Sequence, residues 1–117
     1  MRIAVVGSRG IEAVDLDKYV RDCDEIVSGG AVGVDSCAAE YAKRTDVRLT
    51  EFLPEYNRFG RGAPLKRNLQ IIEYSDEVIA FWDGSSNGTK YVIDQCKRLG
   101  KKVTVHIIKS ARDFYKA

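Results

Sequence analysis

Residues 28–35 read SGGAVGVD, and this stretch sets the expectation for the fold. It follows a short apolar run and leads into an alanine-rich segment, so three glycines fall where a strand is expected to give way to a helix. Glycine weakens both kinds of element, and it needs a local reason there, such as a positive φ or a close approach to the backbone. A tight turn is one such reason, and a ligand lying against the backbone is another.

The same alternation runs along the whole chain, where short β-branched runs are separated by longer segments of helical period. Strands are predicted at residues 2–6, 25–28, 47–52, 77–82 and 103–108, and helices at residues 15–21, 34–43, 63–74 and 89–99. Such alternation is typical of an α/β domain with a parallel sheet. Because crossovers are right-handed, the sequence predicts a three-layer Rossmann-like sandwich whose parallel five-stranded sheet has the order 3-2-1-4-5.

The composition of the 117 residues, 44% hydrophobic and 31% charged, fits one soluble domain spanning residues 1–117. No apolar run approaches the roughly 18 residues of a membrane span, so no membrane association is expected. The 19 basic and 17 acidic residues are too balanced to indicate nucleic-acid binding through overall charge. Three cysteines without CxxC spacing and one histidine predict neither disulfides nor a metal site, indicate a reducing cytoplasm and imply no cofactor.

Three glycine-bearing turns follow predicted strands: GSRG at residues 7–10, SGGAVGVD at 28–35 and DGSSNGT at 83–89. The carboxyl ends of parallel strands share one edge of the sheet, and ligands bind there where the strand order reverses. Two of the turns lead into helices, whose first N–H groups suit an anion such as phosphate. A serine-rich helix cap with an Asn-Gly turn is the alternative for residues 83–89. Neither the Walker spacing nor GxGxxG is present.

Basic residues gather before and within the third long predicted helix. Arg58, Arg61, Lys66 and Arg67 occur in a stretch, residues 57–72, that has no acidic residue. The positive end of the helix dipole disfavours them, and a bound phosphate would offset this cost; a solvated helix start is the alternative. The stretch LPEYNRFGRGAP at residues 53–64 is predicted to be a long irregular loop, and its length makes it a candidate lid.

The motifs VVGSRG, SGGAVGVD, GAPLKRN, SDEVIAFWDGSSNGT and GKKV, in this order, resemble the SLOG superfamily. That superfamily includes the DNA-processing protein A (Smf) family and the LOG phosphoribohydrolases, and this chain is most similar to its small YspA/YpsA-related stand-alone domains. The resemblance covers about residues 1–108. It implies a Rossmann-like fold that binds a nucleotide or nucleotide-derived ligand, and it is compatible with a homodimer because related domains commonly dimerise.

The resemblance also implies which residues bind the ligand. They are Gly7, Ser8 and Arg9 in the first loop, Gly29, Gly30, Gly33 and Asp35 in the second, Arg67 and Asn68 on the third long helix, and Gly84, Ser85, Gly88 and Thr89 in the last loop. Ser28, Asp83 and Asn87, which belong to the same glycine-bearing turns, complete the predicted ligand-binding residues. Ser85, Gly88 and Thr89 are expected to hold phosphate. Arg9 and Arg67 are the expected cationic partners, and Asp35 or Asp83 is expected to accept from a ribose hydroxyl.

One position departs from the enzymes of the superfamily. LOG-type enzymes carry GGxGTxxE, whose glutamate assists cleavage of the N-glycosidic bond, and the similar nucleoside deoxyribosyltransferases place a nucleophilic glutamate at the same offset. Here the stretch reads NGTKYVID, so Val92 takes the glutamate position. Asp94 is two residues on, about 200° around the helix, and cannot act from the same face. No catalytic residue is therefore predicted, and Val92 is expected to extend the buried face.

Three functions remain open from the sequence. The first is binding or sensing of a nucleotide-derived ligand. The second is a hydrolase or transferase acting on nucleotide derivatives, with Asp83, Asp35 or Glu73 as its carboxylate. The third is a single-stranded nucleic-acid module, similar to DNA-processing protein A, with the basic residues 58–67 along its track. A steep salt dependence of oligonucleotide binding would distinguish the third.

Overall fold

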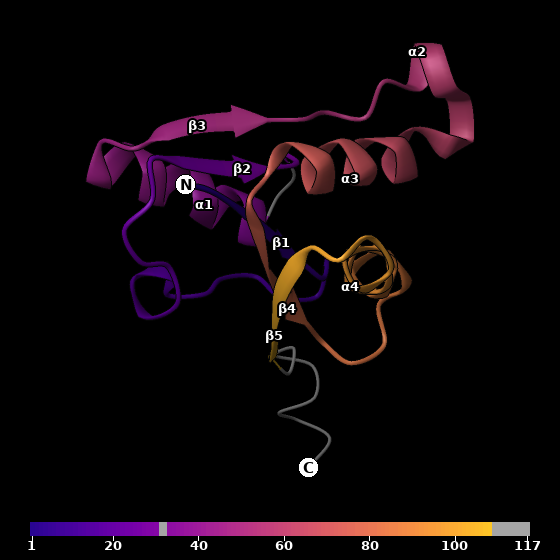
Figure 1. Cartoon of the computed structure of the whole chain (residues 1–117). Helices are drawn as coiled ribbons and strands as arrows, with labels where there is room; N and C mark the ends of the chain where they lie inside the picture. The colour runs from indigo at the N-terminus through magenta and orange to yellow at the C-terminus, as the bar shows by residue number, and fades with distance from the viewer. Residues whose placement is uncertain (31–32, 109–117) are drawn as a thin grey trace.

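The computed structural model describes residues 1–30 and 33–108; Ala31 and Val32 of the second glycine-bearing turn, and residues 109–117, lie outside the described residues (Figure 1). The strands are β1 (Arg2–Gly7), β2 (Glu25–Ser28), β3 (Arg48–Glu51), β4 (Glu77–Trp82) and β5 (Lys102–Ile107). The helices are α1 (Val34–Thr45), α2 (Tyr56–Phe59), α3 (Ala63–Tyr74) and α4 (Asn87–Leu99), with 3-10 turns η1 (Leu16–Lys18) and η2 (Gly60–Gly62).

The sheet confirms the predicted topology. All five strands are parallel, in the order β3-β2-β1-β4-β5. The central strand β1 pairs through Ile3 with Ile26 of β2 on one side and with Glu77 of β4 on the other. Helix α1 packs on one face, and α3 and α4 pack on the other, giving the three layers of a Rossmann-like sandwich (Figure 1).

Two apolar clusters fill the spaces between the layers. Side chains of a strand alternate between its faces, so β1 sends Ile3 and Val5 toward α1 and sends Ala4 and Val6 toward α3 and α4. Each of these four residues is at least nine-tenths buried. Burial on both faces explains why the inner strands read as nearly continuous apolar runs.

The prediction of a helix at residues 15–21 is wrong. The chain forms only the 3-10 turn η1, which Asp15 caps by accepting a 3.2 Å hydrogen bond from the backbone N–H of Asp17. Leu16 and Val20 are both buried, and their spacing of four residues is the same as that of apolar residues on one face of an amphipathic helix. A single turn gains too few backbone hydrogen bonds to offset the cost of nucleating a helix, so the segment remains a short connection.

The stretch predicted as a long irregular loop, residues 53–64, is also different. It contains the single turn α2, the 3-10 turn η2 and the first residues of α3. Phe59 is half-buried, with the Arg58 guanidinium 5.0 Å and the Lys66 ammonium 5.9 Å from its ring centroid. These local contacts accompany short helical turns in the stretch. Its glycines favour an irregular loop instead, so the sequence did not predict these turns. The remaining predicted elements end within two residues of their observed ends.

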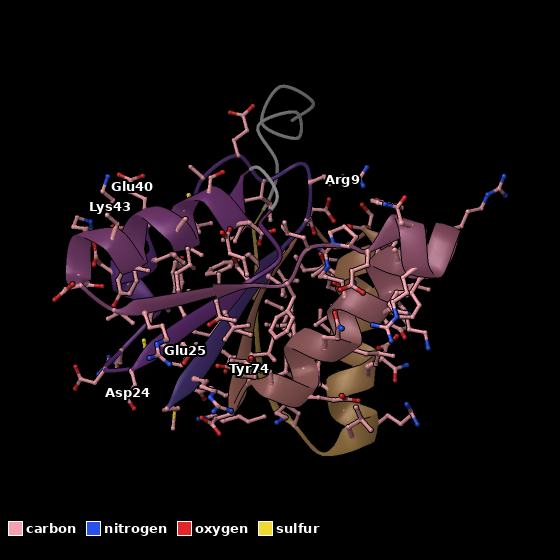
Figure 2. All side chains as sticks on the ribbon, turned by 90° about the horizontal axis from the view of Figure 1, so that it is seen from above. Arg9, Asp24, Glu25, Glu40, Lys43 and Tyr74 are labelled. Carbon is pink, nitrogen blue, oxygen red and sulfur yellow. The ribbon has the colours of Figure 1, made fainter. Side chains whose placement is uncertain are left out.

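A buried carboxylate connects β2 to β3 and to the end of α3. Glu25 is 5% exposed; its Oε2 accepts a hydrogen bond from the Tyr74 hydroxyl and another, of 2.7 Å, from Thr50 Oγ1. Burial by itself raises the pKa of Glu25, but these hydrogen bonds and the nearby Arg48 guanidinium outweigh it and hold the pKa below its usual value. Figure 2 shows Glu25 and Tyr74 at the opposite end of the sheet from Arg9. No helix among residues 1–30 and 33–108 could span a membrane.

Removing the Tyr74 hydroxyl tests this network. Tyr74→Phe keeps the ring but leaves a buried carboxylate short of a donor, so the free energy of unfolding at neutral pH should fall by about 1.5–3 kcal/mol. A lowered pKa means that Glu25 stabilises the fold fully above its unfolded pKa and loses this contribution as pH falls through the folded value. The difference between wild type and variant should therefore shrink in strong acid. Urea unfolding across pH measures it, with Tyr56→Phe, at an exposed tyrosine, as the control. Equal losses in both variants would contradict the assignment.

Candidate functional site

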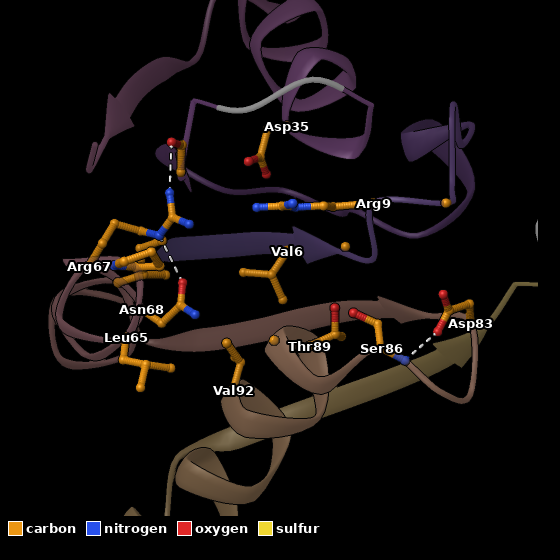
Figure 3. A pocket seen from close by; sticks show the side chains of 16 residues that line it. Val6, Arg9, Asp35, Leu65, Arg67, Asn68, Asp83, Ser86, Thr89 and Val92 are labelled. Atoms are coloured by element: carbon orange, nitrogen blue, oxygen red, sulfur yellow. Dashed lines mark hydrogen bonds between the residues drawn. The ribbon is translucent and has the colours of Figure 1, made fainter. Parts of the chain in front are cut away.

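A cavity of about 430 Å³ opens where the strand order reverses between β1 and β4 (Figure 3). Its lining comes from the ends of β1 and β2, from α1, and from α3, α4 and the β4–α4 loop. The predicted residues that line it are Gly7, Arg9, Gly29, Asp35, Arg67, Asn68, Asp83, Gly88 and Thr89. The structure thus brings part of each predicted loop, and the pair on α3, around one space.

The N-terminus of α4 forms one wall of the cavity. Lys90 donates the first helical hydrogen bond, 3.2 Å to the carbonyl oxygen of Ser86, so the backbone N–H groups of residues 87–89 precede the helical bonding pattern. The first turn contains no acidic residue, and the Ser86 side chain makes no capping hydrogen bond. A Cβ built on Gly88 meets no described atom within 4 Å. This wall therefore combines backbone donors, a positive dipole end and open space.

Asp83 braces the loop that leads into α4. Its Oδ1 accepts hydrogen bonds from the backbone N–H groups of Ser85, at 2.9 Å, and Ser86, at 2.7 Å. These two backbone donors hold the pKa of Asp83 below its usual value. Ser8 connects the loop to β1, because its Oγ donates to Thr89 Oγ1 and accepts from the Asp83 backbone N–H, both at 3.2 Å. The loop is thus held in shape before any ligand arrives.

Arg67 connects α3 to the second glycine-bearing turn. Its Nη1 donates to the carbonyl oxygen of Gly29 at 3.0 Å, and its Nε donates to Asn68 Oδ1 at 2.8 Å. A Cβ on Gly29 would lie 2.5 Å from Nη1, so the glycine leaves room for the guanidinium. Arg67 therefore has a structural partner as well as a place on the cavity wall.

Arg9 differs from Arg67 in having no such tie. Its side chain is exposed and makes no hydrogen bond or ion pair with another residue in the described ranges. Figure 3 shows it extended across the cavity toward the side where Asp35 of α1 lies. The Arg9 guanidinium is therefore a positive charge in the cavity wall that a negatively charged ligand could contact.

The other predicted site residues do not line the cavity. They are Ser8, Ser28, Gly30, Gly33, Gly84, Ser85 and Asn87. Gly30, Gly33 and Gly84 have φ of +72°, +78° and +89°, a conformation that favours glycine, so these three shape turns. Ser28 is fully buried, and its Oγ has no hydrogen-bond partner among the described residues. Ser85 is exposed and donates to Asp83 Oδ1 at 3.4 Å.

Sequence reasoning missed much of the cavity wall. The lining also includes Val6, Gly10, Pro64, Leu65, Ile71, Ser86 and Val92. Most of these are apolar, and a buried valine or isoleucine on an amphipathic element reads as core whether or not it also borders a cavity. The prediction chose Ser85 instead of the adjacent Ser86, because sequence spacing alone does not reveal which of two neighbouring serines faces the cavity. Of the basic residues within positions 58–67, Arg67 lines the cavity, whereas Arg58, Arg61 and Lys66 do not.

No group of three or more histidine, cysteine or acidic side chains in the described ranges is arranged to hold a metal ion. No protein-family model, curated protein or solved structure matches this chain. The cavity offers the backbone donors of the α4 N-terminus, the guanidinium groups of Arg9 and Arg67, the two carboxylates of Asp35 and Asp83, and apolar side chains from α3 and α4.

Two glycines of the cavity should differ in how strongly an added methyl group affects stability. A Cβ on Gly7 would lie 2.4 Å from Cγ2 of Val34, so Gly7→Ala should lower the free energy of unfolding by about 1–3 kcal/mol through overpacking. Gly88→Ala places its methyl in open space and should change stability by less than about 1 kcal/mol. Chemical denaturation of both variants measures this. Comparable destabilisation by the two would contradict the difference in packing.

Proposed function

We propose that this protein binds or senses a nucleotide or nucleotide-derived small molecule in the cavity at the carboxyl ends of β1 and β4. The observation that carries the proposal is the N-terminus of α4, whose first-turn backbone donors and open space at Gly88 belong to the same cavity as the guanidinium of Arg9, which has no hydrogen bond or ion pair within the described residues. Helix N-termini and guanidinium groups both favour phosphate. The cavity volume of about 430 Å³ falls within the range of small-molecule sites.

The remaining lining supports the other parts of a nucleotide. Asp35 lies across the cavity from α4, where its carboxylate oxygens suit a sugar hydroxyl. Asp83 is a second candidate for that role, and its Oδ1 also accepts from two backbone N–H groups of the loop. Leu65, which is exposed, supplies apolar contact for a base, and the nearly buried Ile71 and Val92 add a small apolar surface to the cavity wall. The resemblance to the SLOG superfamily supports the same ligand class. The three free cysteines suit a cytoplasmic protein.

Catalysis by cleavage of a glycosidic bond is less well supported. Such chemistry needs a carboxylate beside the sugar. Val92 takes the position of the glutamate that the enzymes use, and it is 2% exposed against the apolar core. Asp94 points to solvent and pairs with Lys90 at 3.1 Å, and Glu73 is exposed outside the cavity lining.

Asp35 and Asp83, the other two carboxylates considered for such an enzyme, do line the cavity. Asp83 Oδ1 is held by the backbone N–H groups of Ser85 and Ser86, and Asp35 lies on the wall opposite Val92 (Figure 3). We therefore propose binding rather than turnover.

Ligand-induced stabilisation tests the proposal. Mononucleotides at millimolar concentration should raise the melting temperature, because binding to the folded state at 100 times Kd adds about 2.7 kcal/mol to its stability. Gly88→Val should abolish the shift by filling the space beside the α4 donors. Gly62→Val is the matched control, since Gly62 also has open space around its Cβ but lies outside the cavity lining. Absence of any shift with wild type, across a panel of mononucleotides, would overturn the proposal.

The two cavity arginines should contribute differently. Arg9→Ala should weaken nucleotide binding by about 1.5–3 kcal/mol, the range for a charge-assisted hydrogen bond, with unchanged stability because Arg9 has no partner in the described ranges. Arg67→Ala should lower both affinity and stability, because it also breaks the contact with Gly29. Calorimetric titration and urea unfolding separate the two effects, with exposed Arg21→Ala as control. An Arg9→Ala protein that binds as tightly as wild type would remove Arg9 from the site.

A further inference from the structure

The side chain of Asn68 has a fixed orientation in the cavity wall. Its amide oxygen accepts from Nε of Arg67 at 2.8 Å. An arginine Nε only donates, so the atom facing it must be the oxygen, and the amide nitrogen takes the other position. Figure 3 shows this amide group beside the cavity, with its nitrogen turned away from Arg67. Asn68 therefore offers two N–H donors to whatever occupies this end of the cavity.

Arg67 adds further N–H donors beside those of Asn68. A guanidinium has five N–H donors and no acceptor, so the Arg67–Asn68 pair presents a wall of donors. An asparagine with both amide atoms available can pair with an amino group and a ring nitrogen of adenine together. Here the oxygen is engaged by a charged donor, and a ligand amino group placed against the pair would face further N–H groups. The pair thus favours an acceptor such as a carbonyl oxygen.

The surroundings of Asn68 suit a base rather than a phosphate. Leu65 and Ile71 of the same helix, and Val92 of α4, also line the cavity. Apolar side chains give no compensation for the desolvation of a phosphate, whereas they pack well against the faces of a planar ring. Val92 lies four residues along α4 from Gly88, about 6 Å at 1.5 Å per residue. A sugar can span such a separation between a phosphate at the α4 N-terminus and a base beside Val92.

We infer that Asn68, oriented by Arg67, selects ligands whose base carries a carbonyl oxygen, such as a 6-oxopurine, over their amino counterparts. The inference rests on the proposed function, since it assigns the base end of the same cavity. It makes Asn68 a specificity-determining residue and Arg67 its positioning residue. The phosphate end, formed by α4 and Arg9, is common to both ligand classes and does not discriminate between them.

Calorimetric titration with inosine 5′-monophosphate and adenosine 5′-monophosphate tests this directly, because the two share their sugar and phosphate. Wild type should bind the inosine nucleotide on the order of tenfold more tightly, as expected for one well-placed hydrogen bond. Asn68→Asp keeps an oxygen for Arg67 and replaces the amide donor with an acceptor. Its preference should fall to parity or reverse. Asn57→Asp, at an exposed position on α2 outside the cavity lining, controls for the added negative charge and should retain the wild-type ratio.

Ribose 5-phosphate, which has no base, completes the design. Its affinity should be nearly equal in wild type and Asn68→Asp; a loss as large as that of the inosine nucleotide would mean that Asn68 contacts the phosphate, and would overturn the inference. Equal binding of the two nucleotides by wild type, or an unchanged ratio in Asn68→Asp, would overturn it too while leaving the proposed function standing. Failure of wild type to bind any of the three ligands or other mononucleotides would overturn both.

Discussion

The reversal of strand order at β1 is the constraint on which the rest of the structure depends. From β1 the chain moves outward through β2 to β3 and then returns past β1 to β4 and β5. The crossover helix α1 consequently lies on one face, while α3 and α4 lie on the other. Helices that leave neighbouring strands in opposite directions cannot close over the strand ends between them. The cavity occupies this opening, and its walls are the first turns of the diverging elements.

Close packing at the end of β1 keeps this opening well defined. Gly7 lets α1 approach until the position of a Cβ would lie 2.4 Å from the Val34 side chain. Ser8 then joins the loop after β4 to the start of α4 through two hydrogen bonds. Across the cavity, Arg67 ties α3 to the carbonyl of Gly29. These contacts join the loops after β1 and β4 to each other and α3 to Gly29, so binding a ligand requires little further ordering of these parts of the wall.

The charges around the cavity divide into those used by the fold and those left for a ligand. Asp83 and Arg67 carry opposite charges, and both have hydrogen bonds that shape a loop or connect two elements. Arg9 has none within the described ranges and extends over the space instead. The two arginines are indistinguishable by residue type, and only their partners separate a structural role from a binding one. In the same way, the hydrogen bond from Arg67 to the amide oxygen of Asn68 leaves the Asn68 amide nitrogen as a donor for a ligand.

The sequence by itself determined the layered α/β architecture, the strand order and the edge of the sheet where glycine-rich turns gather. Those features follow from hydrophobic periodicity and from the handedness of crossovers, which act over short stretches of chain. It did not determine that residues 15–21 form only the turn η1, or that residues 53–64 contain α2 and η2. It also did not reveal that Leu65, Ile71 and Val92 border a cavity, or that Ser86 rather than Ser85 faces it. Tertiary structure decided these points, because the side of an element that borders a cavity depends on neighbours distant in sequence. Short-range hydrophobic patterns contain no information about those neighbours.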